Sequence, residues 1–304
     1  MASTDPTADD FAYDEFAYLH ENAEEVGLAW AGPPAVARVE VRVSGARTVS
    51  ALRWGSEPIE IVLLHGTAQN AHTWDTVLLA LGRPALAIDL PGHGHSGWRD
   101  DLGYRPHQLA DDVAVVLDEL VDGPVVLVGM SLGGATANAL AARRPDLVRR
   151  LVAVDITPNP RSDDAKDIHD FIAGPQTFPS FAEILERTVR YNPTRSVSSL
   201  RRGILHNAVR NPDGSWKWRY DRRDRSQPPA VEAPDPWAEL ESITAPYLLV
   251  RGGAKGSMVR DEGAAELQRR LPEAEVVTVE GAGHSVQGDR PLELAAILEE
   301  FGFG

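Results

Sequence analysis

The stretch Gly129-Met130-Ser131-Leu132-Gly133 decides the fold of this chain. The five residues before it, 124–128, read Pro-Val-Val-Leu-Val, a run that is typical of a strand buried on both faces. The residues after it, 135–144, are rich in Ala and Leu and contain neither Gly nor Pro, which favours a helix. A turn this tight needs positions 129 and 133 to lack a side chain, and it leaves Ser131 at the tip, above the N-terminus of the helix.

The same alternation of buried strand and helix extends over most of the chain. Short apolar runs predict buried strands at 61–64, 85–88, 125–128, 151–154, 247–250 and 276–279. Helical patterns lie between or after them, at 73–81, 108–120, 135–144, 262–271 and 291–301. Strands that alternate with helices predict right-handed crossovers, so we expect an α/β fold with a mostly parallel, doubly wound sheet. An antiparallel hairpin, 39–43 with 49–54, is expected before it.

The alternation breaks between residues 157 and 241, where no strong buried strand occurs. We interpret 157–241 as an inserted helical cap that separates two parts of one core, 36–156 and 242–304. Helices are expected at 181–191 and 198–209 within the cap. Trp216 and Trp218 alternate with charged residues there, which is typical either of packing inside the cap or of a wall of a substrate cleft.

The first 35 residues form an N-terminal extension outside the core pattern. Residues 9–25 are acidic and carry several aromatic side chains, which predicts an amphipathic helix. Such a helix would pack on its own domain, cover it, or contact a partner subunit. Nothing in the sequence decides between a monomer and a homodimer.

Composition limits the class of protein. The chain has 304 residues, 43% of them hydrophobic, and a net charge of −15, which disfavours nucleic acid, anionic membranes and strongly anionic substrates. The absence of cysteine excludes disulfides and a cysteine nucleophile. The acidic N-terminus lacks the features of a signal peptide, and no apolar run approaches the ~18 residues of a membrane span. We therefore expect a soluble, cytoplasmic protein.

Three further motifs accompany the Ser131 turn. They are His65-Gly-Thr67, Asp89-Leu-Pro-Gly-His-Gly-His-Ser96 and Gly281-Ala-Gly-His-Ser285, each after a predicted strand. In this order and at these strand ends, the motifs resemble those of the α/β-hydrolase superfamily from about residue 38 to the C-terminus. The resemblance implies the α/β-hydrolase fold, a Ser nucleophile at position 131 and no cofactor.

A serine hydroxyl needs a neighbouring base to act as a nucleophile. His284 is the expected base, because small residues flank it and let its loop approach Ser131. The backbone N–H groups of Thr67 and Leu132 are the expected donors of an oxyanion hole. No pair of histidines has the H-x-x-x-H spacing of a helical metal site, so no metal is predicted.

The acid of the triad departs from the commonest pattern of the superfamily, which places an Asp just after the strand at 247–250. That loop has Lys255 at the usual position and no carboxylate before Asp261. Asp155 follows the strand at 151–154 in an Asp-Ile-Thr-Pro context. A similar context carries the acid in some bacterial esterases of the superfamily, so we expect Asp155 to be the acid, with Asp261 as the alternative.

These residues predict a serine hydrolase that cleaves a neutral or weakly charged carboxylic ester, a lactone or a thioester through an acyl-enzyme. Trp216 and Trp218 are candidate substrate-binding residues. The alternatives are a catalytically weak binding or receptor protein on the same fold, a C–C bond hydrolase, or a cofactor-free haloperoxidase-like enzyme.

Overall fold

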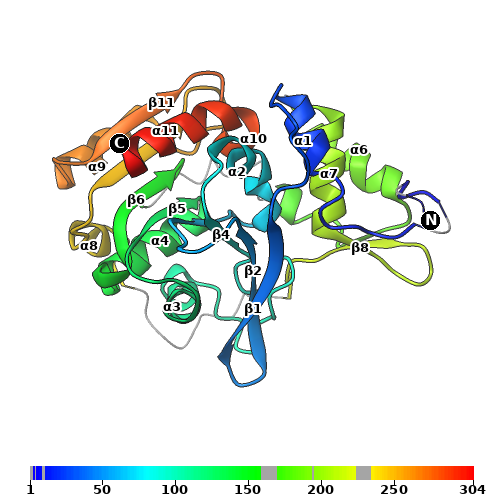
Figure 1. The fold of residues 1–304 in the computed structure, drawn as a ribbon, viewed down its shortest axis with the longest axis horizontal. Helices are drawn as coiled ribbons and strands as arrows, with labels where there is room; N and C mark the ends of the chain where they lie inside the picture. The colour runs from blue at the N-terminus through cyan, green and yellow to red at the C-terminus, as the bar shows by residue number, and fades with distance from the viewer. Residues whose placement is uncertain (1–2, 4, 9–10, 159–169, 194, 224–233) are drawn as a thin grey trace.

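The computed structural model describes residues 3, 5–8, 11–158, 170–193, 195–223 and 234–304. A large α/β body carries the sheet, and a smaller body contains the cap helices and lies next to the N-terminal segment (Figure 1). No helix among the described residues is long and apolar enough to cross a membrane.

The core sheet has eight strands in the order β1-β2-β4-β3-β5-β6-β10-β11. The strands span Val36–Ser44 (β1), Arg47–Trp54 (β2), Ile61–Leu64 (β3), Ala85–Ile88 (β4), Val125–Met130 (β5), Val148–Val154 (β6), Tyr247–Gly252 (β10) and Glu275–Val279 (β11). β2 pairs antiparallel with both β1 and β4, and every other neighbouring pair is parallel. This arrangement confirms the predicted fold class and the predicted hairpin.

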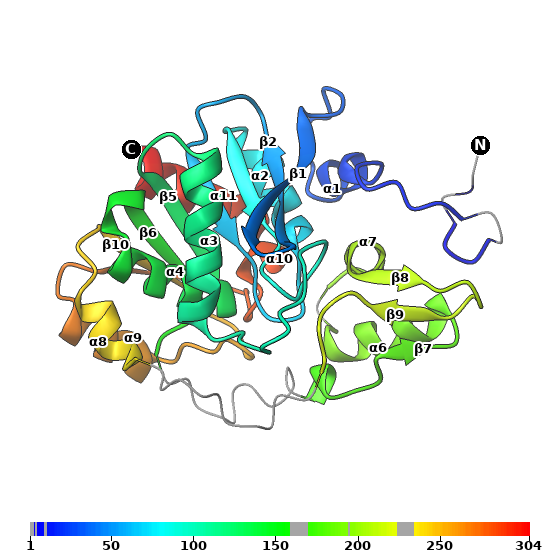
Figure 2. The same cartoon turned by 90° about the horizontal axis from the view of Figure 1, so that it is seen from below.

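Helices cover both faces of the sheet (Figure 2). They are α2 (Asp75–Leu81) and α11 (Pro291–Phe303) on one face, and α3 (Pro106–Leu120), α4 (Leu132–Arg143), α8 (Pro236–Glu241) and α9 (Asp261–Arg270) on the other. Central strands therefore bury alternate side chains in two separate clusters. In β5, Val125 and Leu127 pack beneath α3 and α4, whereas Val126 and Val128 pack beneath α2 and α11. Burial on both faces explains why these strands are continuously apolar.

Short helical turns complete the core near the ends of its strands. They are η1 (Ala71–Trp74), η2 (Pro145–Leu147) and α10 (Val286–Asp289). The first lies between β3 and α2, and the last lies between β11 and α11, so both belong to the edge of the sheet at which the parallel strands end.

The described part of the cap combines helices with a small antiparallel sheet, ordered β7-β9-β8. Its elements are β7 (Thr177–Phe178), α6 (Phe181–Tyr191), α7 (Val197–Asn207), β8 (Ala208–Arg210) and β9 (Trp216–Trp218). Serine side chains cap both helices, because Ser180 Oγ accepts the N–H of Glu183 and Ser196 Oγ accepts that of Ser199. Residues 159–169 and 224–233 of the predicted cap lie outside the described residues.

The N-terminal segment lies against both the cap and the core. The expectation of a helix over 9–25 is wrong for most of its length, because α1 spans only Leu19–Glu25; residues 9 and 10 lie outside the described residues. The aromatic residues before α1 pack in different directions instead of forming one helical face. Phe11 packs against Trp216 of the cap (ring centroids 5.7 Å apart), whereas Phe16 packs on the core cluster beneath α2. The segment therefore joins the cap to the core.

Candidate active site

Ser131 occupies a strained turn between β5 and α4. Its φ is 52° and its ψ is −116°, a region that non-glycine residues rarely adopt and that is common at functional sites. A Cβ on Gly129 would lie 2.3 Å from the carbonyl oxygen of Gly133, and a Cβ on Gly133 would lie 2.3 Å from that of Leu64. Only glycine fits at both positions, so these two residues are what allows the chain to fold back so sharply.

The loop after β3 lies directly against this turn. A Cβ on Gly66 would lie 2.5 Å from Met130 Sδ and 3.3 Å from Ser131 Cβ. Thr67 follows Gly66 and is exposed, and Leu132 is the first residue of α4. The first N–H groups of a helix have no partner within that helix. Both predicted oxyanion donors therefore come from backbone adjacent to Ser131.

Two side chains position the β3 loop. His65 is fully buried; its Nε2 accepts the N–H of Leu90 (2.9 Å), and its Nδ1 therefore donates to the carbonyl of Gly66 (2.8 Å). Burial lowers the pKa of His65, which favours this neutral tautomer. Gln69 accepts the N–H of Gly66 through Oε1 (3.1 Å) and donates from Nε2 to Ser285 (3.4 Å). No pattern in the sequence predicts that Gln69 links this loop to the loop that carries His284.

His284 is hydrogen-bonded to Asp155. The distance between His284 Nδ1 and Asp155 Oδ2 is 2.8 Å. Asp155 is fully buried and follows β6 with a positive φ of 49°, so its carboxylate is held at the end of the strand. Because β6 and β10 are neighbours, the carboxyl ends of both strands lie near the same histidine.

The loop after β10 supplies hydrogen-bond donors to Asp155. Its carboxylate accepts the N–H of Gly252 (3.0 Å), the hydroxyl of Ser257 (2.5 Å) and the N–H of Met258 (2.7 Å). These three bonds satisfy the oxygens of a carboxylate that has no contact with water. Where the commonest pattern has its acid, the end of β10 and the loop after it therefore bind the carboxylate of Asp155, which follows the neighbouring strand β6.

Asp261 lies in a different environment from Asp155. It is the first residue of α9, its side chain is 89% exposed, and it forms an ion pair with Arg251 at 2.6 Å. Among the described residues, no hydrogen bond joins His284 to Asp261. The N-terminus of a helix favours a negative charge, which accounts for its position without a catalytic role.

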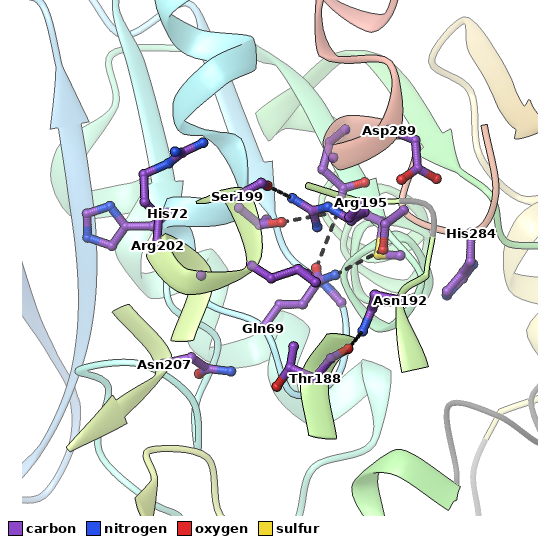
Figure 3. Close-up of a pocket in the computed structure, with 18 of the residues that line it drawn as sticks. Gln69, His72, Thr188, Asn192, Arg195, Ser199, Arg202, Asn207, His284 and Asp289 are labelled. Carbon is purple, nitrogen blue, oxygen red and sulfur yellow. Dashed lines mark hydrogen bonds between the residues drawn. The ribbon is translucent and has the colours of Figure 1, made fainter. Parts of the chain in front are cut away.

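Ser131 and His284 line the same cavity, which has a volume of about 800 Å³ and lies between the core and the cap. Figure 3 shows His284 beside residues of the cap such as Asn192 and Arg195. In the part of the chain that the structure describes, no hydrogen bond joins the Ser131 hydroxyl to the imidazole. Such contacts are often long in the absence of substrate and shorten in the reacting complex. The two residues thus line one cavity, and no hydrogen bond joins their side chains.

The two candidate substrate-binding tryptophans of β9 lie in different surroundings. Trp218 lines the cavity. Trp216 does not; both indoles are almost fully buried, but Trp216 packs between Phe11 of the N-terminal segment and Phe181 of α6. We therefore assign Trp216 to packing, because two aromatic rings contact it and it does not line the cavity.

A second cluster of ionisable residues lies where the core, the cap and the N-terminal segment meet. His72 Nδ1 contacts Asp75 (2.8 Å), His72 Nε2 contacts Glu15 (3.0 Å), and the ring of His72 stacks on that of His206 with centroids 3.8 Å apart. Tyr13 Oη hydrogen-bonds to Nδ1 of His206 (2.6 Å). We define these residues as the junction cluster.

The junction cluster contains a possible metal-binding set, since one ligand atom each of His72, Asp75 and His206 lies within 4.8 Å of the others. The geometry does not favour coordination. The two rings are nearly parallel, at 12°, so their nitrogen lone pairs do not converge on one point. Both nitrogens of His72 already contact carboxylates. We interpret the cluster as an ion-pair network.

The fold and these motifs can be compared with those of known proteins. The model of the alpha/beta hydrolase family matches residues 61–297, which is most of the chain. The chain belongs to the α/β hydrolase family. Among its relatives is the esterase Rv0045c of Mycobacterium tuberculosis, which is 46% identical over 94% of this chain and 94% of its own length.

A second relative and a solved structure extend this likeness. The sn-1-specific diacylglycerol lipase ABHD11 of Xenopus laevis is 32% identical over 76% of this chain and 75% of its own. A structure of the M. tuberculosis esterase superimposes with a TM-score of 0.82 at 45% identity, and the match covers 94% of this chain and 98% of that one. This likeness covers the cap as well as the core, because so little of either chain lies outside the match.

Proposed function

We propose that this protein is a serine hydrolase that cleaves carboxylic esters of small molecules through an acyl-enzyme. The observation that carries the proposal is the His284–Asp155 hydrogen bond of 2.8 Å, made at the same cavity that the Ser131 turn lines. The esterase and lipase activities in the names of the two relatives support the same reaction class.

The residues take the following roles in the proposed reaction. The hydroxyl oxygen of Ser131 attacks the ester carbonyl carbon while Nε2 of His284 accepts the hydroxyl proton. Asp155 holds the imidazole by its Nδ1–H and stabilises the imidazolium that forms. The carbonyl oxygen becomes negatively charged and accepts hydrogen bonds from the backbone N–H groups of Thr67 and Leu132, each worth about 10²- to 10³-fold in rate.

The tetrahedral intermediate then breaks its bond to the alcohol oxygen, which leaves with the proton from His284. Water attacks the remaining acyl-serine while His284 accepts a proton from that water, and a second tetrahedral intermediate forms. When this intermediate breaks its bond to the Ser131 oxygen and releases the carboxylic acid, His284 donates the proton to that oxygen. A lactone or a thioester would follow the same steps. Gln69 and His65 are positioning residues in this scheme, since they hold the loop that carries the Thr67 donor.

The test combines labelling and turnover. The protein should react covalently with a fluorophosphonate probe at Ser131 and should hydrolyse p-nitrophenyl butyrate. Ser131→Ala should abolish labelling and lower kcat by roughly 10⁴- to 10⁶-fold with an unchanged melting temperature. Adding His284→Ala to Ser131→Ala should cost little more, because members of a triad act as a unit. A protein that folds but neither reacts with the probe nor hydrolyses the ester would be a binding protein on this fold.

A further inference from the structure

The cap places a cation in the candidate active site. Arg195 lies just before α7 and lines the cavity together with Ser131 and His284. Figure 3 shows its guanidinium among Ser199, Asp289 and Gln69. A charged group in a substrate cavity constrains which substrates can bind, so its partners decide what it does.

The guanidinium of Arg195 has few protein partners for its five N–H donors. Nη2 donates to the hydroxyl of Ser199 (2.5 Å). Among the described residues, this is the only hydrogen bond that Arg195 forms through its guanidinium. Nε is buried and has no hydrogen-bond partner there. Buried donors are nearly always satisfied in folded proteins. A cation with an unsatisfied donor at a cavity wall can therefore bind a ligand that accepts hydrogen bonds.

No carboxylate of a described residue forms an ion pair with Arg195. The charges of Asp289 and Glu25 act on it, but from beyond the 4.0 Å of an ion pair. Burial lowers the pKa of Arg195 from its ordinary value, although a guanidinium stays protonated in proteins. Asp289 is itself engaged, since its Oδ2 accepts the N–H of Gly283 (2.9 Å). The positive charge is thus only partly balanced by the protein.

The other cavity-lining arginines differ from Arg195. Arg202 forms ion pairs with Glu25 and Glu21 on α1 and donates to Asn22 (2.6 Å), so its charge is neutralised by the protein. Arg290 is exposed and donates to the backbone carbonyl of Glu280 (3.3 Å). Arg195 alone of these three arginines combines burial of a donor with the lack of a strong acceptor.

The core makes room for this guanidinium next to the His284 loop. A Cβ on Gly288 would lie 2.7 Å from Arg195 Nη1 and 2.8 Å from its Cζ. Gly288 lies in α10, four residues after His284. The Arg195 side chain therefore extends from the cap onto the core element that follows His284, and any side chain at position 288 would displace it.

We propose that Arg195 binds a carboxylate of the substrate, so that half-esters of dicarboxylic acids are the preferred substrate class. The planar guanidinium offers two parallel N–H donors that match the two oxygens of a carboxylate. The ester end of the substrate lies at Ser131 while the free carboxylate lies at Arg195. This inference rests on the proposed esterase function. It also explains how a protein with a net charge of −15 can accept an anion: the positive charge is local.

The test compares matched esters. Hydrolysis of monomethyl succinate, glutarate and adipate is followed in a pH-stat beside the uncharged dimethyl ester of each acid, and kcat/KM for the half-ester is divided by that for the diester. Arg195→Gln should lower this ratio by roughly 10- to 100-fold, mainly through KM of the half-ester. Arg195→Lys keeps the positive charge but loses the two parallel N–H donors. Its ratio should therefore lie between those of Arg195→Gln and the native protein.

A matched control is available on the cap. Arg190 lies on α6, is highly exposed, and pairs with Glu186 at 3.3 Å. Arg190→Gln removes the same charge from the cap without touching the cavity, and should leave the ratio unchanged. A ratio that is the same in the native protein, Arg195→Gln and Arg195→Lys would overturn the proposal. So would an equal loss on half-ester and diester with a lowered melting temperature, which would make Arg195 a packing residue.

A binding measurement separates this inference from the proposed function. Calorimetric titration of monomethyl glutarate into Ser131→Ala, and into Ser131→Ala with Arg195→Gln, needs no turnover. Binding that is weakened about 10-fold or more by the second substitution supports the carboxylate site even if the reaction were not ester hydrolysis. Suppose instead that the native protein hydrolyses only the diester, in a Ser131-dependent reaction, and that Ser131→Ala does not bind the half-ester. This result would support the proposed esterase function and would contradict the carboxylate site at Arg195.

Discussion

Two pairs of a histidine and a buried aspartate in this protein have the same hydrogen-bond distance and different surroundings. In the candidate active site, His284 Nδ1 lies 2.8 Å from Asp155 Oδ2. In the junction cluster, His72 Nδ1 lies 2.8 Å from Asp75 Oδ2. Both aspartates are almost completely buried. A histidine–aspartate hydrogen bond by itself therefore does not identify a catalytic base.

The second ring nitrogen distinguishes the two pairs. Nε2 of His72 contacts the carboxylate of Glu15 (3.0 Å), so this imidazole lies between two anions. Burial alone would lower the pKa of His72, but the charge of Asp75 and the hydrogen bonds to Asp75 and Glu15 outweigh it and raise the pKa to about 9. His72 is then a cation at neutral pH and cannot accept a proton. Both histidines line the cavity, but Nε2 of His284 has no hydrogen-bond partner among the described residues, so this nitrogen is available to accept a proton.

Substitution of each aspartate should separate the catalytic pair from the structural pair. Asp155→Asn should lower kcat by up to about 10⁴-fold, because an amide can hold the wrong tautomer of His284. Asp75→Asn should change kcat less than tenfold and should lower the melting temperature instead. Steady-state kinetics with p-nitrophenyl butyrate and thermal unfolding measure both effects.

Asp261→Asn is the matched control for the acid. Asp261 is 89% exposed and pairs with Arg251, so its loss should cost only a few tenths of a kcal/mol of helix stability. Near-normal kcat in Asp155→Asn together with a large loss of kcat in Asp261→Asn would show that Asp261, after β10, is the acid of the triad.

The contrast between the two pairs also explains what the sequence could predict. The Ser131 turn, Asp155 and His284 each follow a strand within a short motif, so the local pattern together with the resemblance to the superfamily was enough to predict them. The fold class followed from the same alternation of strand and helix. His72 has no local signature, because its partners Glu15 and His206 lie 57 and 134 residues away in the sequence.

The cap and the N-terminal segment were less predictable for the same physical reason. Residues 11–18 carry the aromatic content of an amphipathic helix, but their partners lie in the cap and the core, and tertiary packing outweighed the helical pattern. Arg195 gave no signal in the sequence, because a charged residue in a loop is ordinarily solvated. Its significance depends on Gly288, which only the fold brings to it.

The pH dependence of stability provides a second test of the junction cluster. The pKa of His72 is raised in the folded protein from about 6.5 to about 9, so its contribution is complete below pH 6.5 and is lost as the pH rises through 9. A shift of this size corresponds to about 3 kcal/mol. Urea unfolding of the native protein and of His72→Gln should show a stability difference that shrinks by that amount between pH 6 and pH 9.5. An exposed histidine replaced in the same way, His20→Gln, is the control for the substitution itself.

The two tryptophans of β9 are alike in sequence and differ in what covers them. Residues two apart on a strand point to the same side, so both were candidates for the cleft wall. Phe11 and Phe181 cover Trp216, whereas Trp218 lines the cavity. Trp218→Phe should therefore lower kcat/KM for a long acyl ester relative to a short one by about 3- to 10-fold, since only the longer chain extends to the cap. Trp216→Phe should leave that ratio unchanged, and an equal change of the ratio in both variants would show that the β9 hairpin acts on the substrate as one unit.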